Sequence, residues 1–124
     1  MTESTLLKHI RLAATRAGAV LFRNNCGIAF YPAGQAVRFG LCEGSSDLIG
    51  FLSVPVSSLP LGSTVAVFVA VEVKAPGGRT ARKRWVKQAN FLDRVREAGG
   101  IGIVAASVED LDVGLAKYKK GVRE

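Results

Sequence analysis

The chain has 124 residues, 48% of them hydrophobic, and a formal net charge of +7 at pH 7. This length suits one domain with a single core, over residues 1–124, and the hydrophobic content excludes a disordered chain. The longest apolar run, Val65 to Val71, is far shorter than the roughly 20 residues that a membrane-spanning helix needs, so we expect no such helix. The positive charge favours a polyanionic partner, although ribosomal, membrane-surface and other soluble proteins share it.

Cys26 and Cys42 are two isolated thiols. They show neither the CxxC spacing nor the nearby histidine of a zinc site, so we interpret them as reduced packing residues. The first residues also lack the basic stretch and apolar core of a secretory signal. Together these features indicate a cytoplasmic protein, in the host cytoplasm if a virus encodes it.

The first predicted element is an amphipathic helix. Its apolar positions recur every three or four residues from Leu6 to Ala17, and Gly18 closes the pattern. Glu3 falls on the same stripe, one turn before Leu6, so we expect its carboxylate to face inward.

A strand over residues 19–25, AVLFRNN, is predicted next, and it ends in polar side chains. A glycine-rich excursion through Gly27, Pro32, Gly34 and Gly40 follows it. A turn at Gly44 then leads into a second short strand, in which Asp47 stands at the entrance and the apolar residues continue to Leu52.

Residues 65–74 give the clearest strand prediction, because they are nearly all apolar and a Pro-Gly-Gly turn ends them. Alternate residues of a strand share a face. Glu72 and Lys74 therefore point to one side, and Val71 and Val73 point the other way into the core.

Residues 81–98 carry a helical pattern that two glycines end. Trp85 lies on its apolar stripe and is interpreted as a core anchor, and Gln88 falls on the same buried stripe. A short buried strand, IGIVAAS, and a last helix that starts at Ser107 complete the chain. The predicted order is one helix, three or four strands, and then helix, strand, helix.

The two acidic residues at strand ends raise an electrostatic question. If Asp47 and Glu72 approach to about 4 Å, they repel by roughly 4 kcal/mol at an effective dielectric near 20, so positive charge must lie between them. Lys74 alone could supply it, as a structural ion pair. A Mg²⁺ ion suits the position better, because it takes oxygen ligands, keeps several waters and binds substrate phosphate.

In their order along the chain, these motifs resemble the PD-(D/E)XK nuclease superfamily, and within it the virus-type replication-repair nuclease (VRR-NUC) domain. The stretch GSSDLIGF around Asp47 is similar to that family's glycine-then-Ser-Asp signature. Glu72 and Lys74 match its E-x-K element, and Gln88 matches the glutamine of the following helix. The likeness covers nearly the whole chain, although the proline that commonly precedes the aspartate is absent. Further matches are Arg23 with Asn24 or Asn25, for an Arg-Asn element, and Glu3, for a leading glutamate.

The resemblance implies an α/β fold with a restriction-endonuclease-like core, in which a central mixed β-sheet is flanked by α-helices. It also implies a Mg²⁺-dependent DNA endonuclease of replication or repair, with Mn²⁺ able to substitute. The substrate would be branched or Holliday-junction-like DNA, and the protein would act as a homodimer. The implied metal ligands are Asp47, Glu72, the backbone carbonyl of Val73 and, as a further carboxylate, Glu3.

The implied catalytic residues are Asp47, Glu72, Lys74 and Gln88. Lys74 would steady the attacking water and the scissile phosphate, and Gln88 would orient Lys74 or the water. Arg23 and Asn24 are assigned to nucleic-acid binding.

A basic cluster begins the helix that follows the E-x-K strand. The helix dipole disfavours cations there by some tenths of a kcal/mol each, so stability does not explain their position. A helix N-terminus with arginines is an anion site, and we expect the cluster to bind nucleic acid. A solvated surface run is the alternative. The cluster consists of Arg79, Arg82, Lys83, Arg84 and Lys87.

Two other functions stay open. A non-enzymatic basic DNA-binding module is the first alternative, and a tRNA- or ribosome-associated basic protein is the second. Neither requires Asp47, Glu72 and Gln88 to face inward.

Overall fold

The computed structural model describes residues 1–56, 60, 62–75 and 82–122, without the side chains of residues 82, 83 and 117–122. None of the helices in this part of the chain is long and apolar enough to cross a membrane. The elements in chain order are α1 (Glu3–Arg16), β1 (Ala19–Arg23), β2 (Gly27–Phe30), β3 (Ala36–Phe39), β4 (Leu48–Pro55), β5 (Thr64–Val73), α2 (Arg82–Glu97), β6 (Ile101–Ala105) and α3 (Val108–Val122).

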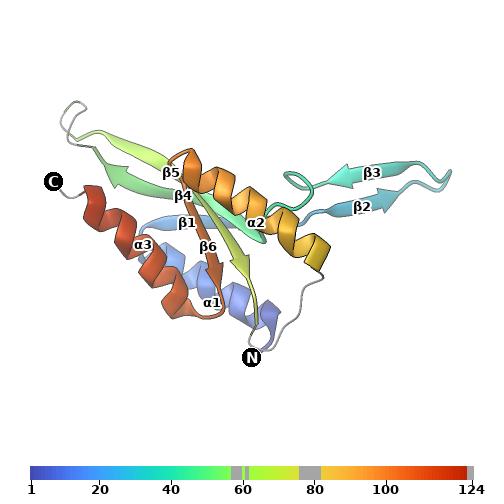
Figure 1. Cartoon of the computed structure of the whole chain (residues 1–124), viewed down its shortest axis with the longest axis horizontal. Helices are drawn as coiled ribbons and strands as arrows, with labels where there is room; N and C mark the ends of the chain where they lie inside the picture. Colours follow the sequence, from blue (N-terminus) through green and yellow to red (C-terminus); the bar gives the residue numbers. More distant parts are fainter. Residues whose placement is uncertain (57–59, 61, 76–81, 123–124) are drawn as a thin grey trace.

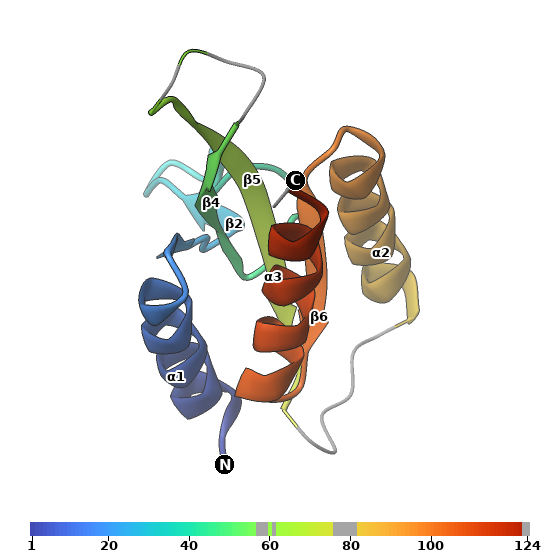
Figure 2. The ribbon, with the colours of Figure 1, turned by 90° about the vertical axis from the view of Figure 1, so that its left-hand side faces the viewer.

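A four-stranded mixed sheet forms the centre of the molecule (Figure 1). Its strand order is β1-β4-β5-β6, with β1, β4 and β5 antiparallel in turn and β6 parallel to β5. Helices α1 and α3 lie against one face, and α2 lies on the other side, as Figure 2 shows. The predicted α/β class with a mixed sheet between helices is therefore confirmed.

The main core lies between the sheet and the pair α1 and α3. Val71 and Val73 are fully buried in it, as their alternation with Glu72 and Lys74 predicts. The apolar stripe of the first helix also packs here, and Gly18 follows it in the left-handed conformation. The fully buried large side chains of this core are Ile10, Leu48, Leu52, Val69, Val71, Val73, Leu111 and Leu115.

Helix α2 approaches the opposite face of the sheet at Gly102. A Cβ at this position would lie 2.9 Å from the carbonyl oxygen of Leu92, so any other residue would push the helix outward. On this face the side chains of Glu72 and Lys74 point toward α2 rather than into the main core, because they alternate with Val71 and Val73. The close contact of helix and sheet thus decides what surrounds the two charged residues.

Residues 27–39, which were predicted only as a glycine-rich excursion, contain two strands. Strands β2 and β3 form a two-stranded antiparallel ribbon that extends away from the body of the molecule (Figure 1). In the described part of the chain five strands therefore lie between α1 and α2, instead of three or four. The ribbon has no buried face, so its sequence lacks the contrast between core and solvent positions that identifies most antiparallel strands.

Candidate active site

The start of β4 and the end of β5, which pair with each other, bring Asp47 and Glu72 together. In the antiparallel register Leu48 lies opposite Val71, so Asp47, just before Leu48, comes level with Glu72. The Asp47 N–H donates a hydrogen bond to Oε1 of Glu72 at 3.3 Å. In return, the N–H of Val73 donates to Oδ2 of Asp47 at 2.8 Å. The two acidic residues are thus held side by side by the backbone of the sheet.

Lys74 is fixed by groups from both the strand and the helix. Its Nζ lies 3.2 Å from Oε2 of Glu72 and donates to Oε1 of Gln88, also at 3.2 Å. Gln88 comes from α2 and is 97% buried, with a relative exposure of 3%. The ammonium also lies 5.6 Å from the centre of the Trp85 ring, within cation–π range. Three side chains therefore set where this positive charge lies.

Arg23, at the end of β1, contributes a second cation. Its Nη1 lies 3.8 Å from Oδ1 of Asp47, and its side chain is about two-fifths exposed, at 42%. A pair at this distance and exposure contributes little stability, typically below about 1 kcal/mol. Among the described residues each of these two carboxylates therefore has one basic neighbour within 4 Å, and the contact of Lys74 with Glu72 is the closer of the two.

The protonation of Glu72 reflects these surroundings. Burial, as the largest cause, and the negative charge of Asp47 together raise the pKa of the Glu72 carboxyl from 4.5 to about 7. Lys74 opposes both effects but does not outweigh them. The ionised form of Glu72 is thus incompletely compensated within the chain, and a further cation between the two carboxylates would favour it.

The donor atoms of the site suit a hard divalent cation. The carboxylates of Asp47 and Glu72, with the carbonyl of Val73 next to them, are oxygen ligands of the kind that Mg²⁺ prefers. Within the described residues no group of three or more His, Cys, Asp or Glu side chains is placed to hold a metal. Water and a substrate phosphate would therefore have to complete the coordination of Mg²⁺, as is usual for this ion.

Glu3 does not join the two carboxylates, and it does not face inward as predicted. It is exposed in the first turn of α1, where Thr2 caps the helix by accepting a hydrogen bond from the N–H of Thr5. Burial on this stripe of α1 begins only at Leu6. An exposed acid in a first turn is favoured by the helix dipole, which gives Glu3 a sufficient physical reason for its position.

Asn24 holds the loop that leads to Asp47. Its Nδ2 donates to Oγ of Ser45 and to the carbonyl of Ser46, both at 2.8 Å, and its Oδ1 accepts from the N–H of Leu41 at 3.1 Å. Its own N–H donates to the carbonyl of Asp47 at 2.8 Å. Asn24 therefore acts on the site by positioning this loop, and its contact with nucleic acid stays a prediction. Sequence reasoning missed this loop anchor, although an Asn after a strand and two serines before Asp47 carry the signal.

The same loop packs closely on α2 at Gly44. This residue has a positive φ of 80°, and a Cβ there would lie 2.7 Å from Cβ of Lys87. Both conditions favour glycine. The loop before Asp47 is thus held by Asn24 on one side and by α2 on the other.

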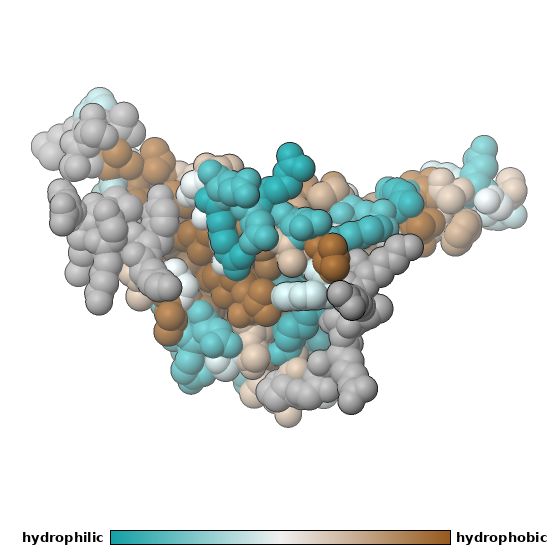
Figure 3. Space-filling model, viewed as in Figure 1, coloured by the Kyte–Doolittle hydropathy of each residue, from teal (hydrophilic) through white to brown (hydrophobic). Residues whose placement is uncertain are grey.

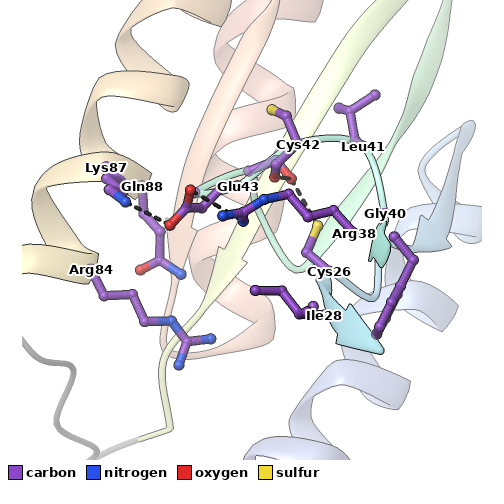
Figure 4. Close-up of a pocket in the computed structure, with 14 residues that line it drawn as sticks. Cys26, Ile28, Arg38, Gly40, Leu41, Cys42, Glu43, Arg84, Lys87 and Gln88 are labelled. Carbon is purple, nitrogen blue, oxygen red and sulfur yellow. Dashed lines mark hydrogen bonds and ion pairs between the residues drawn. The ribbon is translucent and has the colours of Figure 1, made fainter. Parts of the chain in front are cut away.

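A cleft of about 1000 Å³ opens beside the site, between α2 and the base of the ribbon (Figure 4). Gln88 lines the cleft and also contacts Lys74, so this side chain is where the cleft adjoins the site. Glu43 lies within it and accepts from Nζ of Lys87 at 2.6 Å and from Nη1 of Arg38 at 3.4 Å. With Arg84 on the same wall, three cations face one carboxylate, a net charge of +2.

The cleft contains part of the predicted basic cluster. Arg84 and Lys87 line it, whereas Arg79 and the side chains of Arg82 and Lys83 lie outside the described residues. Arg38, on β3, lines the cleft with Arg84 and Lys87, and its distance along the chain from the cluster gives no signal of this in the sequence.

Two predictions of burial near the cleft are wrong. Cys26 and Cys42 are exposed free thiols that line the cleft, instead of packing residues. Trp85 is 37% exposed, and is not a core anchor. In Figure 1 the first turns of α2 extend beyond the sheet, and the described part of its apolar stripe is buried only from Gln88 (3% exposed) to Leu92 (1% exposed).

The site thus combines two acids, an ammonium group and a buried amide at the edge of a positively charged cleft. Such a set can bind a hard cation, a phosphate group and a water molecule. Comparisons of this chain with models of protein families, with curated proteins and with solved structures find no match in any of the three.

Proposed function

We propose that the protein is a Mg²⁺-dependent nuclease that hydrolyses phosphodiester bonds in DNA, built on a restriction-endonuclease-like core. One observation supports this most directly: two carboxylates, a lysine and a glutamine from three separate elements meet at one edge of the sheet, beside a basic cleft. A structural ion pair would need only Lys74 and Glu72, whereas here Asp47 and the buried Gln88 are added to them. The same residues carry the resemblance to VRR-NUC nucleases.

Asp47 and Glu72 would hold the cation together with the carbonyl of Val73. Their relative position is fixed by backbone hydrogen bonds, so little reorganisation would be needed on binding. A bound Mg²⁺ supplies Lewis-acid chemistry, which acidifies water and offsets negative charge that develops on the phosphate.

Lys74 is placed to act on the substrate. Hydrolysis adds water across one P–O ester bond: the water oxygen bonds to phosphorus and releases a proton, and the departing ester oxygen takes up a proton. The phosphate gains negative charge on the way, and an ammonium group that is already oriented by Glu72 and Gln88 can donate a hydrogen bond to it. Gln88 is thus a positioning residue for Lys74.

The wider surface suits a nucleic-acid substrate. The net charge of +7 favours phosphate binding, and Arg84 and Lys87 extend positive charge from the site along the cleft. The homodimer and the selectivity for branched DNA that we propose rest on the resemblance to VRR-NUC nucleases.

Cleavage of labelled DNA tests the proposal. Linear duplex, flap and four-way-junction DNA would be incubated with Mg²⁺, Mn²⁺ or EDTA, for the wild type and for Lys74→Ala. We expect metal-dependent cleavage by the wild type and a fall of about 100-fold or more in the variant, because Lys74 acts mainly in the transition state. Lys8→Ala, which removes an exposed lysine from α1, is the matched control and should keep full activity.

Binding of the same DNA in Ca²⁺ separates the enzyme from a simple binder. Affinity should change little in Lys74→Ala, because many phosphate contacts contribute to it.

A non-enzymatic DNA-binding module is the second candidate function. The pairing of each carboxylate with a basic residue of the chain favours it, because such pairs need no metal. Tight binding by the wild type without cleavage of any substrate would establish that candidate instead.

A further inference from the structure

The ribbon of β2 and β3 is exposed to an extent that its composition does not explain. Within the described residues its strands pair only with each other, and every residue of the two strands except Gly27 is exposed. An isolated two-stranded ribbon is marginally stable in water. Figure 3 shows apolar and polar side chains next to each other along this arm. Its large exposed apolar residues are Ile28, Phe30, Val37 and Phe39.

One face of the ribbon continues the wall of the cleft. The register places Ile28 opposite Arg38, and Phe30 opposite Ala36, so these four side chains share a face. Ile28 and Arg38 line the cleft beside the candidate active site, and Phe39 lines it from the other face of the ribbon. Phe30 lies further out on the face of Ile28 and Arg38 and is 71% exposed. The face therefore runs from the cleft to an exposed aromatic ring.

The opposite wall of the cleft is basic. Figure 4 shows Arg84, Lys87 and Gln88 projecting from α2, with Arg38 and Ile28 on the ribbon side. Glu43 joins the two walls through Arg38 and Lys87, and the net charge of the four ionic groups is +2. Charge complementarity thus requires an anionic occupant.

Positive charge combined with an exposed aromatic ring is typical of sites for single-stranded nucleic acid. Cations follow the phosphates of the strand, and bases stack on aromatic rings regardless of sequence. A base pair inside a duplex does not offer its face in this way. A volume of about 1000 Å³ also reaches the upper end of the range for drug-sized ligands, which suits a length of strand better than one small group.

We propose that the cleft between the β2–β3 ribbon and α2 binds an unpaired DNA strand next to the candidate active site, with a base stacked on Phe30 and phosphates bound by Arg38 and Arg84. The inference rests on the proposed function and deepens it. It names the substrate class as DNA in which an unpaired strand adjoins the duplex that is cleaved.

Binding without divalent metal tests this separately from cleavage. Fluorescence anisotropy in EDTA would compare a blunt duplex with the same duplex carrying a ten-nucleotide single-stranded overhang. Stacking of one base contributes roughly 1–3 kcal/mol, so we expect the overhang to bind about tenfold more tightly, and Phe30→Ala to lose most of this advantage. Val37→Ala is the matched control, because it removes an exposed apolar side chain from the opposite face of the ribbon and should keep the advantage.

Two further measurements identify the contacts. A 2-aminopurine base in the overhang should be quenched on binding by the wild type and by Val37→Ala, but much less by Phe30→Ala. Each phosphate contact on single strands contributes about −0.7 to the slope of log K against log salt, so Arg38→Ala with Arg84→Ala should flatten the slope by about 1.4. Circular dichroism spectra of each variant would verify that the fold is intact.

Several outcomes would overturn the inference. Equal affinity of the wild type for both duplexes, or an unchanged overhang advantage in Phe30→Ala, shows that no base stacks there. If Phe30→Ala instead converts a dimer to a monomer in sedimentation without a change in quenching, the ribbon contacts a second copy of the chain. If cleavage depends on Lys74 but not on Phe30, the proposed strand-binding cleft is wrong and the proposed nuclease function stands. If the overhang binds more tightly through Phe30 but no DNA is cleaved, the proposed nuclease function is wrong and the strand-binding cleft stands.

Discussion

The burial of Glu72 predicts an unusual dependence of stability on pH. The pKa of its carboxyl is 4.5 without the effects of the fold and about 7 in the folded protein. Between these values the folded protein binds a proton that the unfolded chain does not, so the free energy of unfolding falls as pH rises from about 4.5 to 7. A difference of this size corresponds to roughly 3 kcal/mol, at 1.36 kcal/mol for each pKa unit. The stability contributed by protonated Glu72 is therefore present below pH 4.5 and lost above pH 7.

Glu72→Gln removes this titration and keeps the shape of the side chain. Its carbonyl oxygen can still accept from the N–H of Asp47, and Gln88 still binds Lys74. The charged groups that surround position 72 are Asp47, Lys74 and, through Asp47, Arg23. In EDTA we expect the variant to be more stable than the wild type at pH 8, by up to about 3 kcal/mol, and the difference to shrink toward pH 5.

Urea unfolding followed by circular dichroism, in EDTA from pH 5 to pH 8, measures this effect. Glu97→Gln, at the exposed end of α2, is the matched control and should follow the wild type. The reasoning is refuted if Glu72→Gln shows the slope of the wild type, or is less stable at every pH. Lys74 would then compensate the charge of Glu72 fully, as a structural ion pair.

Addition of Mg²⁺ at pH 8 should raise the free energy of unfolding of the wild type, by about 2.7 kcal/mol at a hundred times the Kd, but not that of Glu72→Gln.

Two further predictions concern the supports of the site. Asn24→Ala removes three side-chain hydrogen bonds that anchor the loop over residues 41–46, and should cost about 2 kcal/mol in urea unfolding, whereas Asn25→Ala, an exposed neighbour, should cost less than about 0.5 kcal/mol. Equal effects of the two changes would show that the loop does not depend on Asn24. Gly102→Ala places a methyl group 2.9 Å from the carbonyl oxygen of Leu92 and should destabilise the fold by about 1–3 kcal/mol, and an unchanged urea midpoint would mean that α2 lies further from the sheet.

The sequence alone predicts which residues of β5 share a face. Alternation places Glu72 and Lys74 together because Val71 and Val73 must enter the core, and the structure confirms this. It does not predict which strand lies next to β5. The convergence of Asp47 with Glu72 depends on the register between β4 and β5, which is a property of pairing between distant segments. Only the resemblance to a nuclease family connected these residues beforehand.

The errors have two physical causes. A periodic apolar stripe predicts burial only where another element covers it, and burial begins only at Leu6 on α1 and at Gln88 on the described part of α2. Glu3 and Trp85 therefore lie on the predicted stripes and are nevertheless accessible to solvent. The ribbon strands were missed for a different reason: a strand without a buried face shows no alternation of apolar and polar residues to detect.

The antiparallel pairing of β4 with β5 also divides the proposed catalytic set between two halves of the chain. Asp47 precedes β4, and Glu72, Lys74 and Gln88 all follow the connection between Pro55 and Thr64. Pro55 and Thr64 themselves pair at the end of the two strands that is far from Asp47. A cut within that connection would give two fragments, neither of which holds a complete site. Reassembly would have to restore the pairing of Leu48 with Val71 before the acids could meet, so nuclease activity from mixed fragments would directly report the formation of this strand pair.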